Sequence, residues 1–276
     1  MDFGVSHCRG LLQDMHTSTE LALRKTWRVI SASVQGRRHE KTGQPCQDAH
    51  WWTAGPEGLL VAAVADGAGS ASLAELGAEL AASTAVRILA ERLAVVLTGT
   101  EELFRDHLQA AFQAAQEAVL SEAVLRQVHP RELAATLLVV LASPHLVVAG
   151  QIGDGAIIIQ TPYGGLEALT RPAAGEYLNE TQFLVSPAAL NQVQVSCRKG
   201  PITHLALFSD GLQMLALKMP GGEPHAPFFA PLLRLAEAGD VAQARGQLEA
   251  FLKSPRVGDR TDDDLTLVVA AIGDSR

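Results

Sequence analysis

The sequence predicts an α+β fold in which antiparallel sheet is covered by helices on the outside. Apolar runs that suit buried strands follow one another with only short breaks, as antiparallel hairpins require. Helical periodicity is confined to paired segments that lie between or after these runs. No internal repeat stands out in the 276 residues. Strands that neighbour each other in sequence, with helices in separate pairs, are typical of the α+β class.

Each predicted element follows from its own pattern. The strands are read from apolar or β-branched runs at 27–36, 58–66, 135–142, 145–153, 156–161, 203–210 and 263–272. Helical spacing predicts one helix through Leu73, Leu76, Leu80, Thr84 and Ile88 and a second through Phe104, Leu108, Ala111, Ala115 and Val119. Two further helices are expected at 228–238 and 240–253, and polar loops at 36–50 and 162–201. We expect one domain over 27–273, preceded by a disordered extension over 1–26.

Composition and charge exclude several classes of function. The net charge of −8 disfavours a protein that binds nucleic-acid phosphates or anionic membranes. The three cysteines, Cys8, Cys46 and Cys197, form no C-x-x-C pair and support neither a disulfide framework nor a cysteine zinc site. The most apolar run, 133–150, is interrupted at Pro144 and is too short on either side to span a bilayer. These features predict a soluble protein of the cytoplasm, where thiols stay reduced.

Acidic residues recur where the predicted strands end. The five are Asp48, Asp66, Asp154, Asp210 and Asp263. If these strand ends converge, several carboxylates share one small volume and repel one another. A divalent cation removes that cost, and oxygen ligands without cysteine favour Mg²⁺ or Mn²⁺ over zinc. A single Asp-Gly pair is more often an ordinary turn, so it is the whole set that indicates a metal centre.

Taken in order, the motifs resemble those of the protein phosphatase 2C family, which are metal-dependent protein Ser/Thr phosphatases. They are Gln47-Asp48, VADGAG, ATLLVVLA, GDG, FSDGL and DDLT, and the resemblance covers about 27–272. Two further stretches, GRRHEKTGQPCQDAH and GEYLNETQF, look more like a bacterial subgroup. The resemblance implies a four-layer α-β-β-α sandwich of two antiparallel sheets with flanking helix pairs. It also implies two Mn²⁺ or Mg²⁺ ions in a cleft.

The resemblance assigns a role to each acidic position. Asp66 would bridge both metals, and Gly67 would offer its backbone carbonyl to one of them. Asp210 and Asp263 would bind the other metal, and Asp154 could join a third metal site. Asp48 would hold water on the metals. Such a pair of cations activates a water and clamps the phosphoryl oxygens for in-line attack.

Two positions depart from the family pattern. The His that some members carry after Asp-Gly is Ala68 here, and the phosphate-binding Arg of many members is Gly43. The nearest basic replacements are Arg37, Arg38 and His39, of which Arg37 and His39 are predicted as catalytic. The family's Asp-Asn-x-Thr has become Asp-Asp-x-Thr, which adds the negative charge of Asp264.

Three functions stay open at this point. The first is a phosphatase acting on phosphoserine or phosphothreonine in proteins, with a Ser/Thr kinase as partner. The second keeps the metal centre but hydrolyses small phosphate esters. The third is a catalytically weak or inactive relative that binds phosphorylated proteins, which the altered Arg and His positions leave possible.

Overall fold

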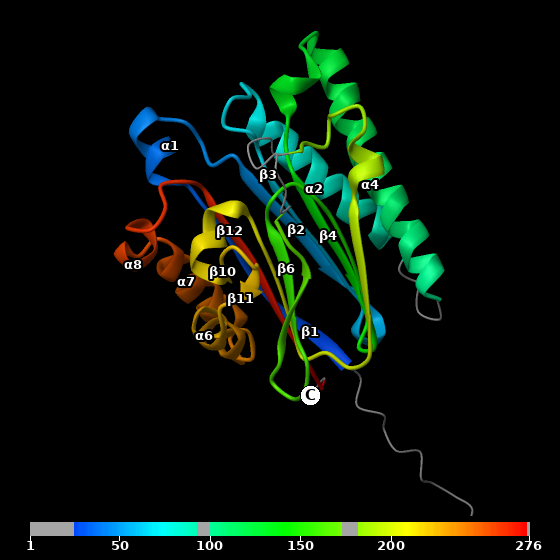
Figure 1. Cartoon of the computed structure of the whole chain (residues 1–276), viewed down its shortest axis with the longest axis vertical. Helices are drawn as coiled ribbons and strands as arrows, with labels where there is room; N and C mark the ends of the chain where they lie inside the picture. The colour runs from blue at the N-terminus through cyan, green and yellow to red at the C-terminus, as the bar shows by residue number, and fades with distance from the viewer. Residues whose placement is uncertain (1–24, 93–99, 173–181, 275–276) are drawn as a thin grey trace, which may run out of the picture.

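The computed structural model describes residues 25–92, 100–172 and 182–274 (Figure 1). Within those residues no helix is both long and apolar enough to cross a membrane. Most of the predicted extension, 1–24, lies outside the described residues. The first strand begins at Lys25, two residues before the predicted start.

Two five-stranded sheets, antiparallel throughout, form the middle of the molecule. The first sheet has the order β1 (Lys25–Val34), β12 (Leu265–Asp274), β9 (His204–Phe208), β6 (Ala156–Gln160) and β7 (Leu166–Thr170). The second has the order β2 (Asp48–Ala54), β3 (Leu60–Asp66), β4 (Leu137–Ala142), β5 (Leu146–Ile152) and β8 (Gln194–Lys199). A separate small hairpin joins β10 (Leu217–Lys218) to β11 (Glu223–Pro224).

Helices cover the outer face of each sheet (Figure 1). The long helices α2 (Ala74–Ala90) and α4 (Glu101–Arg126) pack on the second sheet, and α6 (Ala226–Ala236) and α7 (Val241–Leu252) pack on the first. The short helices are α1 (Arg37–Thr42), α5 (Gln213–Ala216) and α8 (Pro255–Gly258). Single 3₁₀ turns lie at η1 (Pro56–Gly58), η2 (Pro130–Leu133), η3 (Ala189–Gln192) and η4 (Asp210–Leu212). The predicted four-layer sandwich is therefore confirmed.

Strand β3 shows why its sequence is apolar without alternation. Leu60, Ala62 and Val64 point into the layer between the two sheets, where they meet residues of the first sheet. Val61 and Ala63 point the other way, against the α2 and α4 helices. All five are fully buried. Because successive side chains of a strand point to opposite faces, a strand buried on both faces must be apolar at every position.

Both predicted loops contain regular structure. The segment 36–50 holds the six-residue helix α1 and the start of β2, and 162–201 holds β7 and β8. The loop prediction was wrong for these residues because β2, β7 and β8 are edge strands. These three edge strands carry polar side chains and lack the apolar run of a central strand, unlike β1, an edge strand that is mostly buried and was predicted. The predicted strand 203–210 ends at Phe208, and Asp210 lies in the following 3₁₀ turn.

Candidate metal centre

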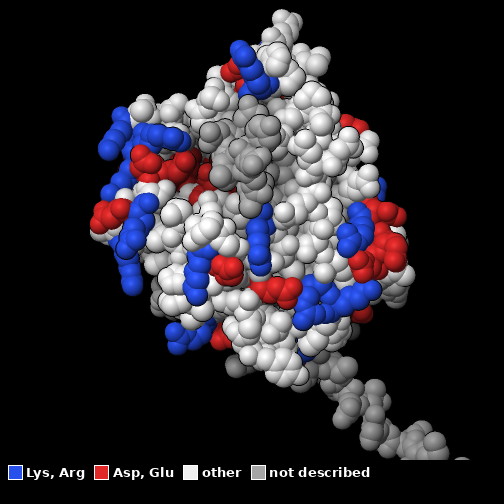
Figure 2. Space-filling view, in the orientation of Figure 1, with Lys and Arg blue, Asp and Glu red and all other residues white. Residues whose placement is uncertain are grey.

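A pocket of about 130 Å³ brings together acids from four separate segments. Asp66, Asp154, Asp210 and Asp263 line it, and Gly67 lies beside them. The other lining residues are Arg38, Ala68, Gly69, Thr136 and Phe183. Figure 2 shows acidic side chains gathered among basic ones on the α1 side of the molecule, at the upper left. All five residues predicted as metal ligands thus meet at one place.

Asp66 is the last residue of β3, and its backbone is held on both sides. Its N–H donates to the Thr136 hydroxyl at 3.0 Å, and its carbonyl accepts from the Thr136 N–H at 2.8 Å. The next residue, Gly67, donates its N–H to the Gln47 carbonyl at 3.1 Å. A Cβ on Gly67 would come within 2.7 Å of the Ala74 carbonyl oxygen at the start of α2. Only glycine lets the strand end pass this close to the helix.

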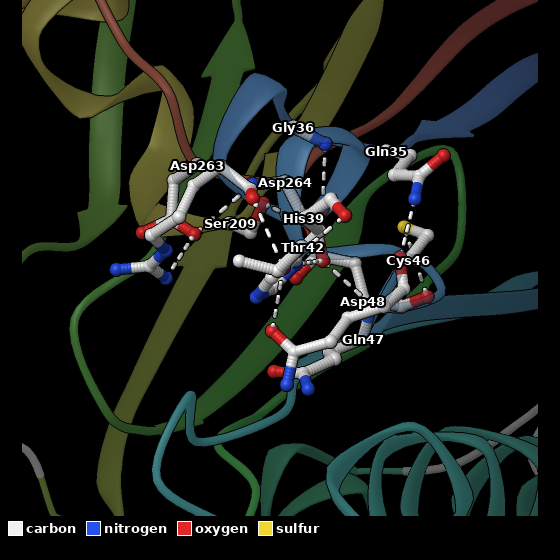
Figure 3. Close-up of polar contacts among 12 residues, drawn as sticks. Gln35, Gly36, His39, Thr42, Cys46, Gln47, Asp48, Ser209, Asp263 and Asp264 are labelled. Atoms are coloured by element: carbon white, nitrogen blue, oxygen red, sulfur yellow. Dashed lines mark hydrogen bonds and ion pairs between the residues drawn. The ribbon is translucent and has the colours of Figure 1, made fainter.

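Asp48 lies directly opposite Asp66 in the pairing of β2 with β3. Its Oδ2 accepts a hydrogen bond from the Ser209 hydroxyl at 2.6 Å (Figure 3). Ser209 Oγ in turn accepts from the Thr266 N–H at 3.1 Å. Asp48 Oδ1 is buried and has no hydrogen-bond partner among the described residues. An unpaired buried oxygen is costly and indicates a place for a further polar partner.

Asp210 and Asp154 reach the pocket from neighbouring turns. Asp210 begins η4 directly after Ser209. A Cβ on Gly211 would clash with the Asp264 carbonyl oxygen, so the turn packs tightly against the segment that bears Asp263. The amide of Gln213 donates to the backbone carbonyl of Asp154 at 2.6 Å. Close packing of the three turns is what places their carboxylates around one pocket.

Asp263 pairs with Arg38, the basic residue of the pocket. The Arg38 guanidinium lies 3.0 Å from Asp263 Oδ1, and the Arg38 N–H donates to the Asp262 carbonyl at 2.9 Å. Both side chains are more than a third exposed. An exposed ion pair of this kind contributes little net stability, so Arg38 can exchange Asp263 for another anion at small cost.

Crowding and burial shift the ionisation of the acids. Burial raises the pKa of Asp66 well above its ordinary value, and the charges of Asp48 and Asp210 raise it further. Burial also raises the pKa of Asp48 to about 7, although the hydrogen bond from Ser209 opposes this. The pKa of Asp263 is raised by burial and by Asp210, against the lowering effect of Arg38. A site that disfavours several of its own negative charges is one that a cation stabilises.

Of the four residues predicted as catalytic, Asp66 lines the pocket, whereas Asp48 is buried opposite it in the strand pairing and Arg37 and His39 turn to other partners. Arg37 turns to Asp259, with its Nη1 3.2 Å from Asp259 Oδ1. His39 is buried and its Nδ1 lies 2.8 Å from Asp264 Oδ2. Neighbouring residues of a helix point about 100° apart, so only one of three consecutive side chains on α1 faces the acids. That residue is Arg38.

Three residues around the site were not predicted. Thr136 and Ser209 hold the acids, and Asp264, noted only for its charge, is a buried acceptor for a neighbouring segment. Ser209 and Asp264 are next to Asp210 and Asp263 in the sequence, and Thr136 is the second residue of the ATLLVVLA motif; these positions were the signal available. The stretch GEYLNETQF (175–183), which resembles the bacterial subgroup, lies outside the described residues apart from its end, where Phe183 lines the pocket.

The model of one protein family matches residues 35–253, and its description is protein phosphatase 2C. The chain belongs to the protein phosphatase 2C family. It is 33% identical over 252 residues to serine/threonine-protein phosphatase 3 of Escherichia coli strain K12, covering 89% of this chain and 98% of that protein. The predicted family and its enzyme class, a phosphatase, are confirmed.

Solved structures show the same fold as this protein phosphatase 2C member. The catalytic domain of the serine/threonine protein phosphatase PstP, solved with two manganese ions, matches with a TM-score of 0.59 and 20% identity, over 91% of this chain and 100% of that one. Serine/threonine phosphatase Stp1 from Staphylococcus aureus matches with a TM-score of 0.61 and 14% identity, over 89% of this chain and 94% of that one.

The residues of this protein phosphatase 2C member fit hard divalent cations. The pocket offers carboxylate oxygens and no cysteine or histidine side chain. Among the described residues, no group of three or more acidic, histidine or cysteine side chains is arranged to hold a metal ion. Mg²⁺ needs none, because it is usually held by one or two carboxylates and keeps several waters. The unpaired, buried Oδ1 of Asp48, which lies opposite Asp66 in the strand pairing, agrees with a further polar partner at the site.

Proposed function

We propose that this chain is a metal-dependent protein Ser/Thr phosphatase, which hydrolyses phosphate monoesters in proteins. One observation carries the proposal: four aspartates from four separate segments line a single pocket together with Arg38. A relative with 33% identity carries the name serine/threonine-protein phosphatase, and the family description is in accord. A phosphoryl-transfer site needs ligands for cations and a positive group that binds the phosphoryl oxygens. The carboxylates and the Arg38 guanidinium of this pocket supply both.

We assign the acids of the pocket to two Mn²⁺ or Mg²⁺ ions. Asp66, Asp210, Asp263 and the backbone carbonyl of Gly67 would hold them. Asp154 would serve a third ion. When bound, such cations would lower the pKa of a bound water and neutralise charge on the phosphoryl oxygens. The chain itself contributes fixed positions, since Asp66 is locked to Thr136 at both its N–H and its carbonyl.

Two further residues complete the proposed site. Arg38 would bind the phosphoryl oxygens of the substrate, because its guanidinium reaches the pocket and is held only by a half-exposed carboxylate. It would take over the role of the phosphate-binding arginine, whose position in the family pattern is occupied by Gly43 in this chain. Asp48 would accept a proton or a hydrogen bond from water in the site, since its Oδ1 is buried and unpaired while Ser209 holds its Oδ2.

The proposal extends to the substrate and its source. Phosphoserine or phosphothreonine on a protein implies a Ser/Thr kinase that supplies it, and this kinase is the proposed partner. We infer the cytoplasm as location because Cys46 and Cys197 are free thiols, which suits a reducing compartment.

The test is hydrolysis of a phosphothreonine peptide and of a generic aryl phosphate with Mn²⁺, with Mg²⁺ and with chelator. Turnover that needs the cation and disappears in Asp66→Asn is the expected result. Asp106→Asn is the matched control, because it makes the same change on the exposed face of α4, far from the pocket. Turnover that persists in chelator would contradict the metal-dependent assignment.

The substrates separate the remaining alternatives. A much higher kcat/KM for the phosphopeptide than for small esters supports the protein phosphatase, and the reverse supports a hydrolase of small phosphate esters. Absence of turnover with intact binding of the phosphopeptide would instead identify a phosphoprotein-binding relative.

A further inference from the structure

His39 and Asp264 form a buried pair beside the pocket that none of the proposed catalytic steps uses. The Nδ1 of His39 lies 2.8 Å from Asp264 Oδ2, and each side chain is only 4% exposed (Figure 3). Both oxygens of Asp264 already accept backbone N–H groups, so the contact fits a hydrogen bond in which His39 Nδ1 is the donor. A polar pair this deeply buried costs free energy unless its hydrogen bonds are fully made.

Asp264 meets that condition by joining three parts of one segment to β12. Its Oδ1 accepts the N–H of Gly36, just before α1, at 2.6 Å. Its Oδ2 accepts the N–H of Gln47, just before β2, at 2.6 Å, as well as Nδ1 of His39. Figure 3 shows these contacts converging on one carboxylate. The whole stretch from 36 to 47, which includes α1, is thereby fastened at its start, middle and end.

An asparagine could not replace Asp264 here. Its side chain has one acceptor oxygen and one NH₂ group, and the NH₂ would face a backbone N–H. The family pattern that this chain resembles has asparagine at this place. The carboxylate and the buried histidine are thus a matched set: the acid supplies enough acceptors, and the histidine supplies a third donor.

The pair determines where Arg38 points. Arg38 directly precedes His39 on α1, and its own N–H is bonded to the Asp262 carbonyl. Because successive helix residues are rotated by about 100°, holding His39 inward against Asp264 leaves Arg38 directed to the pocket and Asp263. Arg37, one residue earlier, is directed to Asp259 instead.

We propose that His39 and Asp264 are positioning residues that hold Arg38 over the pocket, where it binds the phosphoryl group. This inference rests on the proposed phosphatase function for the identity of the anion. It differs from the sequence prediction, in which His39 itself was catalytic. His39 touches no substrate; it acts through Arg38.

The experiment is a double-mutant cycle on His39→Ala and Arg38→Ala. The readouts are the Kd of inorganic phosphate by calorimetry with Mn²⁺ present, and KM and kcat for a phosphothreonine peptide. His39→Ala is expected to weaken phosphate binding and raise KM by about 10-fold, with little change in kcat or in the Kd of Mn²⁺. In the Arg38→Ala background the same change should have no further effect, because residues that act through one another are not additive.

Two variants serve as controls. His39→Asn keeps an N–H donor near the Nδ1 position and is expected to restore most of the phosphate affinity. Lys41→Ala removes an exposed positive charge from the same helix and should leave both readouts unchanged. If His39→Ala does not fold, the cycle is run on His39→Leu, which fills the buried site without a donor to Asp264 and leaves the backbone hydrogen bonds of Asp264 in place.

Additive losses of phosphate affinity would overturn the proposal, as would a loss that appears in Mn²⁺ affinity rather than in phosphate affinity. The phosphate readout keeps this result separate from the proposed function. If the wild-type protein binds phosphate through Arg38 but hydrolyses no ester, the phosphatase assignment fails while the positioning role stands.

Discussion

Asp48, the first residue of β2, and Asp66, the last residue of β3, face each other across the antiparallel pairing of the two strands, and Asp66 lines the pocket. Like charges placed directly opposite on neighbouring strands destabilise a sheet. Here burial and the neighbouring acids raise the pKa of both carboxyls, that of Asp48 to about 7. The protein therefore maintains a crowded acidic site at a cost in stability, which is typical of a site built for function rather than for folding.

The variant Asp66→Asn tests separately the stability cost of the acidic site and its role in catalysis. In chelator, the variant should melt at a higher temperature than the wild-type protein, because a buried charge that repels Asp48 and Asp210 is removed. With Mn²⁺, the wild-type melting temperature should rise while that of the variant stays nearly constant. We expect kcat/KM to fall by roughly 100-fold or more. Thermal melts and kinetics check this, and a variant stabilised by Mn²⁺ as strongly as wild type would contradict it.

Arg38→Ala should weaken the substrate's phosphate contact. We expect KM for a phosphothreonine peptide to rise about 10-fold, the scale of one charge-assisted hydrogen bond. The KM of Arg38→Lys should lie between those of the wild-type protein and Arg38→Ala, because an ammonium keeps the charge but not the planar pair of donors. Initial-rate kinetics measure the effect. A KM as low as wild type in Arg38→Ala would show that another group binds the phosphate.

Gly67→Ala tests the close approach between β3 and α2. The added methyl carbon would lie 2.7 Å from the Ala74 carbonyl oxygen, so the strand end or the helix must move. We expect a loss of about 1–3 kcal/mol in the free energy of unfolding and weaker binding of Mn²⁺. Denaturant melts and calorimetry measure the two effects.

Gly246→Ala is the matched control for that substitution. Gly246 lies within α7, and a Cβ there meets no atom within 4 Å. The change should stabilise the helix by about 0.5–1 kcal/mol. Equal behaviour of the two glycine variants would rule out a special steric role for Gly67.

His50 predicts a pH dependence of stability that can be isolated by mutation. Burial, with a contribution from Arg245, lowers the pKa of His50 from 6.5 to about 4. Between these values the unfolded chain binds a proton that the folded protein does not, so the free energy of unfolding falls as pH falls from about 6.5 to about 4. Because the ring is only partly buried, we expect a contribution on the order of 2 kcal/mol.

His50→Gln should remove this contribution and can still reach Ser33, which lies 2.8 Å from the His50 ring. Relative to its difference at pH 7.5, the variant should gain stability over wild type at pH 4.5. Urea melts at the two pH values measure this, and the subtraction cancels the titration of the aspartates. An unchanged difference would place the pKa of His50 at its ordinary value.

Central and edge strands differ in how far their sequences reveal them. β3 and β4 are buried on both faces, so their residues form uninterrupted apolar runs that predict a strand. β2, β7 and β8 lie at sheet edges, where polar residues such as those of QVSCRK are allowed, and none was predicted. Helix α1 is six residues long, which is too short for a periodic signal.

The residues of the site also differ in how far the sequence reveals them. The sequence alone determined the acids, because Asp66 and Asp210 end or follow buried strands whose apolar runs stop at a recognisable place. The ordered motifs around them were enough to predict the family, the sandwich and a divalent metal centre. The motifs are local patterns of a few residues each, and the sandwich and the pair of ions followed from the family resemblance that these motifs carry.

Only the tertiary structure decided which basic side chain meets those acids. Arg37, Arg38 and His39 are adjacent basic residues, and the sequence does not show which of them faces the pocket. Their directions depend on Asp259, Asp263 and Asp264, more than 200 residues later in the chain. A helix turns each residue about 100° from the last, so the packing of α1 on that distant segment sends one side chain into the pocket, one into the interior and one to the surface.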